Sequence, residues 1–308
     1  MEKPILQVKD LSHRYNVQWA IQGINFEISK HGIYGLLGSN GAGKSTTMNI
    51  ICGVLKQTRG SVLIKGIDVR ENPVSAKRCI GFLPQKPPLH MDLSVYEYLM
   101  HATRMRHVPS SERKKAVKEV MERCGIAHFE NRLIRNLSGG YQQRVGIAQA
   151  IVHKPEFVVL DEPTNGLDPN QILEVRRLIQ DISKECTVIL STHILSEVQA
   201  VCDHVYMIEQ GTMVFSGSLE EFDNYITPST VFVTLRNTPA MSELLEIEGV
   251  EGVEELNGTS FRIRFTKAQE VMDRLVALSA ARHWGMTEIR LEKSSLENIF
   301  AELSKVNN

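Results

Sequence analysis

Apolar residues in the first two thirds of the chain fall into short runs that predict the strands of a largely buried sheet. Uninterrupted runs at 32–37 and 157–160 have the length and composition of strands covered on both faces. Residues 5–8 and 24–28 instead alternate apolar and polar side chains, as half-buried strands do. Further strands are predicted at 60–66, 80–85 and 187–190, a hairpin at 205–208 and 213–215, and helices at about 46–52 and 170–184. This pattern predicts an α/β domain.

A helical pattern replaces the strand pattern between about 90 and 150. Val95, Leu99 and Ala102 recur at helical spacing, and 111–123 is a charged stretch with apolar residues on one face. After an interruption at 137–140, a further long helix is predicted, with Ser138 in position to act as its N-cap. We therefore expect a helical subdomain, about 90–150, inserted in the first domain.

Residues 223–308 form a second predicted domain. Thr227-Pro228-Ser229 marks the linker. The elements between 231 and 291 follow in the order strand, helix, strand, strand, helix, strand, which predicts a small α+β ferredoxin-like domain. A terminal helix is expected at about 294–304, with Leu296, Ile299, Phe300 and Leu303 along one face. That face could pack on its own domain or contact a second chain, and the sequence leaves both open.

Composition and charge narrow the function classes. The 308 residues suffice for about two domains, 1–222 and 223–308. A net charge of −1 gives no support to a nucleic-acid partner, which would favour a basic stripe. No apolar stretch is long enough to span a membrane and no signal peptide opens the chain, which predicts a cytoplasmic protein. The five scattered cysteines predict buried thiols rather than a disulfide framework or a zinc site.

Residues 38–46 match the pattern G-x-x-x-x-G-K-[ST] of the phosphate-binding P-loop, between a predicted strand and a predicted helix. The loop comprises Gly38, Ser39, Asn40, Gly41, Ala42, Gly43, Lys44, Ser45 and Thr46. Its glycines let backbone N–H groups wrap around an anion at the positive end of the following helix. Lys44 is expected to reach the outer phosphates of a nucleoside triphosphate, and Ser45 to ligate Mg²⁺.

Other polar residues follow predicted strands, at the edge where open α/β sheets bind ligands. Asp161 and Glu162 end a buried strand; we expect Asp161 to bind Mg²⁺ and Glu162 to orient or deprotonate the attacking water. Their alternative role is to cap the next turn. His193 could hydrogen-bond the γ-phosphate, and Gln85 stands at another strand end, although either residue alone is as compatible with a structural role.

An aromatic residue ahead of the P-loop could stack on a purine base. Tyr15 is the candidate, but its spacing alone favours a strand-end aromatic that covers the core.

Taken together, these motifs resemble those of ATP-binding cassette (ABC) transporter nucleotide-binding domains. The run Leu137-Ser138-Gly139-Gly140-Tyr141-Gln142-Gln143-Arg144 resembles the signature motif of that family. The remaining matches are Tyr15 as the base-stacking aromatic, 38–46 as the P-loop, Gln85 as the Q-loop, Asp161 and Glu162 as the end of the Walker B strand and the catalytic glutamate, Asn165-Gly166-Leu167-Asp168 as the D-loop, and His193 as the switch histidine. Ser39 and Asn165 depart from the residues common in relatives, but neither change removes a group with an assigned role.

The resemblance implies an ABC-type P-loop NTPase domain that binds ATP and Mg²⁺, with Gln85 among the metal-binding residues. Ser138, Gly139 and Gly140 would meet the γ-phosphate from across a head-to-tail homodimer, or a dimer with a paralogous ATPase subunit. Asp168 of the D-loop is expected among the nucleotide-binding residues.

Gln85 and the helical subdomain would relay the nucleotide state to separate transmembrane permease subunits, with 86–92 as the expected contact. The chain would then lie at the cytoplasmic face of the inner membrane. The C-terminal domain resembles the accessory domain of bacterial exporter and gliding-motility-type ABC ATPases, which implies export.

Two other functions remain open. A soluble ABC ATPase of translation or DNA repair would share the motifs, but this chain has one nucleotide domain, no long coiled-coil insertion and no basic run. A regulatory module without turnover would also bind nucleotide, but Glu162 argues against it.

Overall fold

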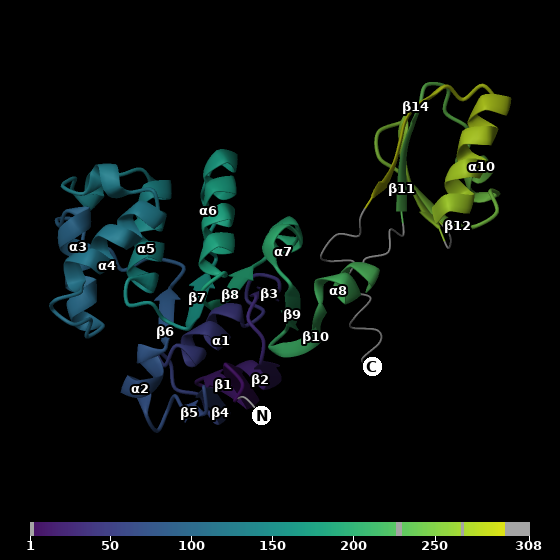
Figure 1. The fold of residues 1–308 in the computed structure, drawn as a ribbon. Helices are drawn as coiled ribbons and strands as arrows, with labels where there is room; N and C mark the ends of the chain where they lie inside the picture. The colour runs from purple at the N-terminus through teal and green to yellow at the C-terminus, as the bar shows by residue number, and fades with distance from the viewer. Residues whose placement is uncertain (1–2, 226–229, 266–267, 293–308) are drawn as a thin grey trace. The chain divides into compact units, whose positions relative to one another are not determined.

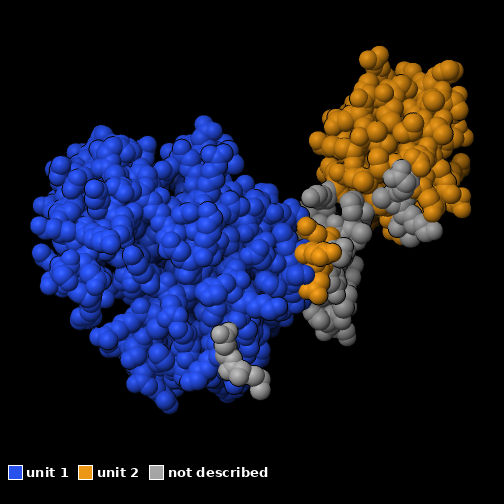
Figure 2. All heavy atoms as spheres, in the orientation of Figure 1, with its two compact units in different colours: residues 1–219 blue, residues 220–308 orange. Residues whose placement is uncertain are grey.

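The computed structural model describes residues 3–225, 230–265 and 268–292 (Figure 1). The chain divides into two compact units, Met1–Leu219 and Glu220–Asn308 (Figure 2). The division falls at the start of helix α8 (Leu219–Tyr225), near the predicted boundary after residue 222.

A six-stranded sheet in the order β10-β9-β3-β8-β7-β6 forms the centre of the first unit. Its strands are β3 (Ile33–Leu37), β6 (Ile80–Leu83), β7 (Phe157–Asp161), β8 (Thr187–Thr192), β9 (His204–Glu209) and β10 (Thr212–Ser218). The predicted hairpin of β9 and β10 is antiparallel, whereas the other neighbours pair in parallel. Strands β3, β7 and β8 are buried along their whole length, as the apolar runs in them predict.

A second, antiparallel sheet has the order β2-β1-β4-β5. Its strands are β1 (Leu6–Tyr15), β2 (Gln18–Ile28), β4 (Arg59–Ile64) and β5 (Ile67–Asp68). The first two are longer than the sequence pattern predicted, because irregularities in their register break the alternation while the pairing continues. Asn16, at a φ of 54°, makes the turn between them. Apolar residues of both sheets and of helix α1 (Lys44–Ile51) share one buried cluster.

The predicted helical subdomain contains α3 (Val95–Met105), α4 (Arg113–Arg123) and α5 (Gly139–Ile151), which Figure 1 shows lying together. Short 3-10 turns at Ala127–Phe129 and Ile134–Asn136 connect α4 to α5. A capping box between Ser94 and Glu97 starts α3. Ser138 occupies the N-cap position of α5, but its side chain makes no capping hydrogen bond, so the predicted capping contact is absent.

Helix α6 (Pro169–Ile182) follows the prediction, whereas α2 (Pro73–Arg78) and α7 (Leu195–Val201) were not predicted. These two helices have six and seven residues, which is too short for a helical period to stand out in the sequence.

The second unit contains β11 (Thr230–Leu235), α9 (Met241–Leu245), β12 (Val250–Glu255), β13 (Ser260–Phe265), α10 (Ala268–Ala281) and β14 (Met286–Glu292). Its strands form an antiparallel sheet in the order β12-β13-β11-β14, the arrangement of the predicted ferredoxin-like fold. Residues of the sheet and both helices form its core cluster. The predicted terminal helix at 294–304 and its apolar face lie outside the described residues.

All five cysteines are free thiols, four of them buried and Cys79 half-buried, in line with the sequence prediction. Burial raises the pKa of each of them. In the described part of the chain, no helix has both the length and the apolar character needed to cross a membrane.

Candidate functional site

The P-loop lies between β3 and α1, and close packing explains two of its glycines. A Cβ at Gly38 would stand 2.3 Å from the Ile208 carbonyl oxygen on β9. At Gly43, where φ is 110°, a Cβ would stand 2.5 Å from Ile21 Cγ2 on β2. Gly41 also has a positive φ, of 85°, but nothing lies near its Cβ position. The loop is therefore fixed at its two ends by packing against both sheets, while its middle is open.

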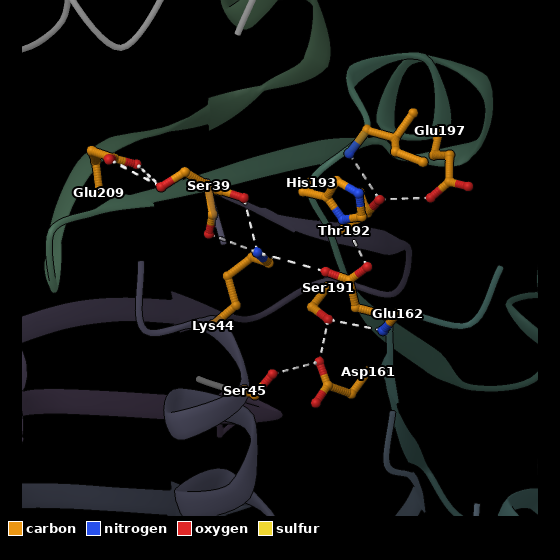
Figure 3. Close-up of polar contacts among 12 residues, drawn as sticks. Ser39, Lys44, Ser45, Asp161, Glu162, Ser191, Thr192, His193, Glu197 and Glu209 are labelled. Atoms are coloured by element: carbon orange, nitrogen blue, oxygen red, sulfur yellow. Dashed lines mark hydrogen bonds and ion pairs between the residues drawn. The ribbon is translucent and has the colours of Figure 1, made fainter. Parts of the chain in front are cut away.

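Lys44 is buried and points back into the loop (Figure 3). Its Nζ donates to the carbonyl oxygens of Gly38 at 2.8 Å and Ser39 at 3.0 Å, and it lies 3.6 Å from Glu162 Oε1. Desolvation by burial lowers the pKa of Lys44, although the Glu162 carboxylate opposes this effect. An ammonium held this way is placed to meet an anion that enters the loop.

Asp161 lies at the carboxyl end of β7, next to the start of α1. Ser45 Oγ donates to Asp161 Oδ1 at 3.2 Å, and the Ser191 hydroxyl on β8 donates to the same oxygen. This pairing follows from the sheet, because Asp161 and Ser191 are partners in the parallel register of β7 and β8. The predicted metal ligands Ser45 and Asp161 are thus in direct contact, and their oxygens suit a hard cation such as Mg²⁺.

Glu162 follows in the left-handed region, with a φ of 50°. Its N–H donates to the carbonyl oxygen of Ser191 at 3.2 Å and to the Ser191 hydroxyl at 3.0 Å. The side chain is 6% exposed, and its Oε2 lies 2.8 Å from His193 Nδ1 (Figure 3). The structure therefore brings Glu162, Lys44 and His193 together, and the simple turn-capping alternative does not explain these contacts.

A buried carboxylate that the sequence did not reveal lies behind these residues. Glu197 on α7 is 4% exposed and accepts from the hydroxyls of Thr164 and Thr192, the latter at 2.6 Å. Thr192 directly precedes His193, and Thr164 follows two residues after Glu162. Glu197 therefore ties together the two segments that carry the predicted catalytic side chains.

A second unpredicted contact holds the P-loop itself. Ser39 Oγ lies 2.9 Å from Glu209 Oε2 and 3.0 Å from Oε1, so the hydroxyl can donate to either oxygen. Glu209 is the last residue of β9, and its carboxylate interacts with the Lys44 charge. Ser39, which departs from the common P-loop pattern, thus has a hydrogen-bond partner within the chain.

A cavity of about 630 Å³ opens over these groups. It is lined by Tyr15, Gln18, Trp19, Ala20, Asn40, Gly41, Gly43, Lys44, Ser45, Thr46, Gln85, Glu162, Gln210 and Gly211. Tyr15 is 53% exposed, so the alternative that it covers the core is wrong. Residues far apart in the sequence, from the end of β1 to the turn between β9 and β10, thus meet around one hollow.

Among the predicted site residues that do not line this cavity are Ser138, Gly139, Gly140 and Asp168. Ser138 and Gly139 are exposed at the start of α5, and Gly140 is buried there against Gln171. The Asp168 side chain caps α6, with Oδ1 accepting from the N–H groups of Asn170 and Gln171 at 3.0 Å each. For Asp168 the structure therefore shows a capping role within the chain, and the predicted nucleotide contact stays a prediction.

A loop that can wrap its amides around phosphates, beside carboxylates suited to a divalent cation, places the first unit among the P-loop nucleoside triphosphatases. The sequence profile of the family described as "ABC transporter" matches residues 21–165. The chain is 38% identical over 212 residues to the bacitracin transport ATP-binding protein BcrA of Bacillus licheniformis, covering 68% of each protein. It is 29% identical over 307 residues to the linearmycin resistance ATP-binding protein LnrL of Bacillus subtilis, covering 97% of this chain and 98% of LnrL.

Among solved structures, the chain resembles the ATP-binding cassette MJ0796, determined as a dimer in a post-hydrolysis state bound to ADP and Pi. The TM-score is 0.63 at 26% identity, covering 70% of this chain and 98% of that one. The chain belongs to the ABC transporter family, as one of its ATP-binding proteins. Such proteins couple ATP hydrolysis to transport and work as dimers with transmembrane permease partners.

Proposed function

We propose that this chain is the ATP-hydrolysing subunit of an exporter and that Glu162 acts on the attacking water. The observation that carries the proposal is the position of the Glu162 carboxylate, 3.6 Å from Lys44 Nζ and 2.8 Å from His193 Nδ1 at the edge of the cavity. A carboxylate between a phosphate-binding lysine and a histidine can accept a proton from water next to the γ-phosphate. The names of BcrA and LnrL, which refer to bacitracin transport and linearmycin resistance, favour export.

ATP would occupy the 630 Å³ cavity, with the base near Tyr15 and the phosphates in the P-loop. Ser45 and Asp161 fit Mg²⁺, because they already share a hydrogen bond and offer the oxygen ligands that Mg²⁺ prefers. In the described residues no group of three or more His, Cys, Asp or Glu could hold a metal, so phosphate oxygens, and Gln85 at the rim, would complete the coordination. The ion would neutralise charge that develops on the γ-phosphoryl group.

The second half of each ATP site would come from a second copy of the chain. Gly139 supports this proposal, because a Cβ there would meet nothing within 4 Å and its φ is not in the left-handed region. Neither packing nor backbone conformation within the chain requires a glycine at this position. A phosphate approaching the exposed N-terminus of α5, near Ser138, would require one.

An apolar groove of about 430 Å³ is the proposed contact with the permease, which would hold the chain at the membrane. Val54, Val74 and Met105 line it and are each more than 60% exposed, so three large apolar side chains gather on one surface. Phe82, three residues before Gln85, lies in the same groove. The groove lies at the ends of α2 and α3, and residues 86–92 do not line it, so the predicted contact at 86–92 stays a separate prediction.

Replacing Glu162 with glutamine tests the assignment. The Glu162→Gln variant keeps the shape but loses the basic oxygen, and its kcat for ATP should fall about 10²- to 10⁴-fold while ATP still binds. Glu156→Gln is the matched control, because Glu156 lies at the opposite end of β7 and its exposed side chain pairs only with Lys65 among the described residues. Hydrolysis by Glu162→Gln at the wild-type rate would exclude Glu162 as the base.

A further inference from the structure

A second large cavity lies away from the nucleotide site. Its volume is about 640 Å³, and it shares no lining residue with the nucleotide cavity. The C-terminal ends of α2, α3 and α5, the loop after α3 and the first half of α4 enclose it. Its lining carries the cations Arg78, Arg106, Lys115 and Lys154 but the carboxylates of only Glu112 and Glu119. The cavity therefore has an excess of positive charge.

The lysines account for only part of this excess, because both lie near the carboxylate of Glu119. Lys115 is 3.8 Å and Lys154 is 3.0 Å from Glu119. Arg106 differs, since none of the ion pairs among the described residues includes it. Its Nη1 donates to the backbone oxygens of Lys77 at 3.0 Å and Ile80 at 3.3 Å, and its Nε and Nη2 make no hydrogen bond to the described residues. A half-buried guanidinium of this kind favours an anion that could accept from its remaining N–H groups.

His153 lines the same cavity and complements Arg106. Its Nε2 lies 3.1 Å from the Ile80 oxygen that Arg106 also contacts, so the two side chains converge on one acceptor. Because a carbonyl oxygen only accepts, Nε2 carries the proton and Nδ1 of the neutral ring is an acceptor. Nδ1 is buried and has no hydrogen-bond partner. Burial and the Arg106 charge lower the pKa of His153 to about 4, so the ring stays neutral at pH 7.

The ligand that suits both groups must offer acceptors to Arg106 and a hydroxyl donor to His153 Nδ1. Monohydrogen phosphate and hydroxyl-bearing phosphate esters carry both kinds of group, whereas sulfate at neutral pH carries acceptors alone. We propose that this cavity is a binding site for a phosphate-bearing anion, held by Arg106 and His153. Arg78 and Arg106 also line the apolar groove described above, so the phosphate could belong to a soluble ester or to a lipid headgroup.

Titration of the full chain with inorganic phosphate tests the proposal, with sulfate as the comparison. The nucleotide site is first filled with a non-hydrolysable ATP analogue and Mg²⁺, so that phosphate cannot enter the P-loop. Phosphate should then bind at least about tenfold more tightly than sulfate, since sulfate leaves the His153 acceptor unpaired. Equal binding of the two anions would overturn the role of His153.

Two variants and one direct probe complete the test. Arg106→Gln should weaken phosphate binding about tenfold or more, whereas Lys118→Gln should not, because Lys118 is an exposed lysine on α4 outside the cavity. If Arg106→Gln does not fold, the ¹⁵N resonances of the His153 ring in the wild-type protein give the same information. A phosphate titration that leaves those resonances unchanged would refute the site.

Vesicles distinguish the two sources of the phosphate. Association with phosphatidic acid vesicles, but not with phosphatidylcholine vesicles, that depends on Arg106 would identify a lipid headgroup. Phosphate binding that depends on Arg106 without such association would identify a soluble ligand. Absence of both would overturn the proposal.

Discussion

Glu197 gives the sharpest test of how the catalytic side chains are positioned. Replacing it with alanine removes two charge-assisted hydrogen bonds from buried threonine hydroxyls, each worth about 1.5–3 kcal/mol. Relief of the cost of burying a carboxylate offsets part of that loss. We therefore expect Glu197→Ala to lower the free energy of unfolding by about 2–4 kcal/mol.

Glutamine at position 197 should destabilise the protein less than alanine does. Thr192 Oγ1 already accepts from the Ile194 N–H at 3.0 Å, so it needs an acceptor for its own proton, which the amide oxygen can supply. The amide NH₂ would then face Thr164, whose hydroxyl can turn to accept. We expect Glu197→Gln to cost about 1–2 kcal/mol, because neutral hydrogen bonds replace charged ones.

Denaturant unfolding and steady-state ATPase assays measure the two consequences. Because Glu197 does not line the cavity, KM for ATP should stay near wild type while kcat falls about tenfold in Glu197→Ala, with Glu197→Gln in between. Glu185→Ala is the control; its exposed carboxylate pairs with Arg123, so it should cost under about 1 kcal/mol and leave kcat unchanged. If Glu197→Ala matched the control in both assays, the positioning role would be refuted.

Three further predictions concern other parts of the first unit. Gly139→Ala should leave thermal stability unchanged or slightly raised, since its Cβ meets nothing within 4 Å, yet abolish ATP-dependent dimerisation in size-exclusion chromatography; dimers that form normally would contradict the shared site. Tyr15→Ala should raise KM for ATP about tenfold, through the loss of base stacking, with kcat preserved in the same ATPase assay; an unchanged KM would remove Tyr15 from the base site. His153, whose pKa is lowered to about 4 from 6.5, stays neutral in the folded protein while the unfolded chain protonates. Its contribution to stability is therefore intact above pH 6.5 and is lost as the pH falls towards 4, by up to about 3 kcal/mol, and urea unfolding across that range should show a smaller loss in His153→Gln.

The sequence predicted the features that depend on residues close together in the chain. An apolar run followed at once by two acids identified β7 with Asp161 and Glu162, and the P-loop pattern placed Lys44 and Ser45. The α/β class, the helical subdomain and the strand and helix order of the second unit also follow from periodicity.

Contacts that depend on strand order or on short elements could not be predicted. Glu162 meets His193 because β7 and β8 are adjacent and parallel. The amino-acid sequence of neither strand shows which other strand it pairs with. Glu197 looks like an ordinary polar residue of a helix too short to detect, and its burial arises from two distant threonines. Arg106 and His153 converge on one backbone oxygen of β6 only after three segments pack together.

The burial of the native thiols makes this chain convenient for site-specific labelling. Four of the five cysteines are buried and have a raised pKa, so a maleimide meets little accessible thiolate there, and Cys79 is the half-buried exception. A cysteine introduced at Lys118, whose side chain is 77% exposed on α4, would be accessible to the reagent. In a Cys79→Ser variant, a fluorophore or spin label at this position would react selectively, and it could report on the helical subdomain in real time while Gly139 stays unchanged.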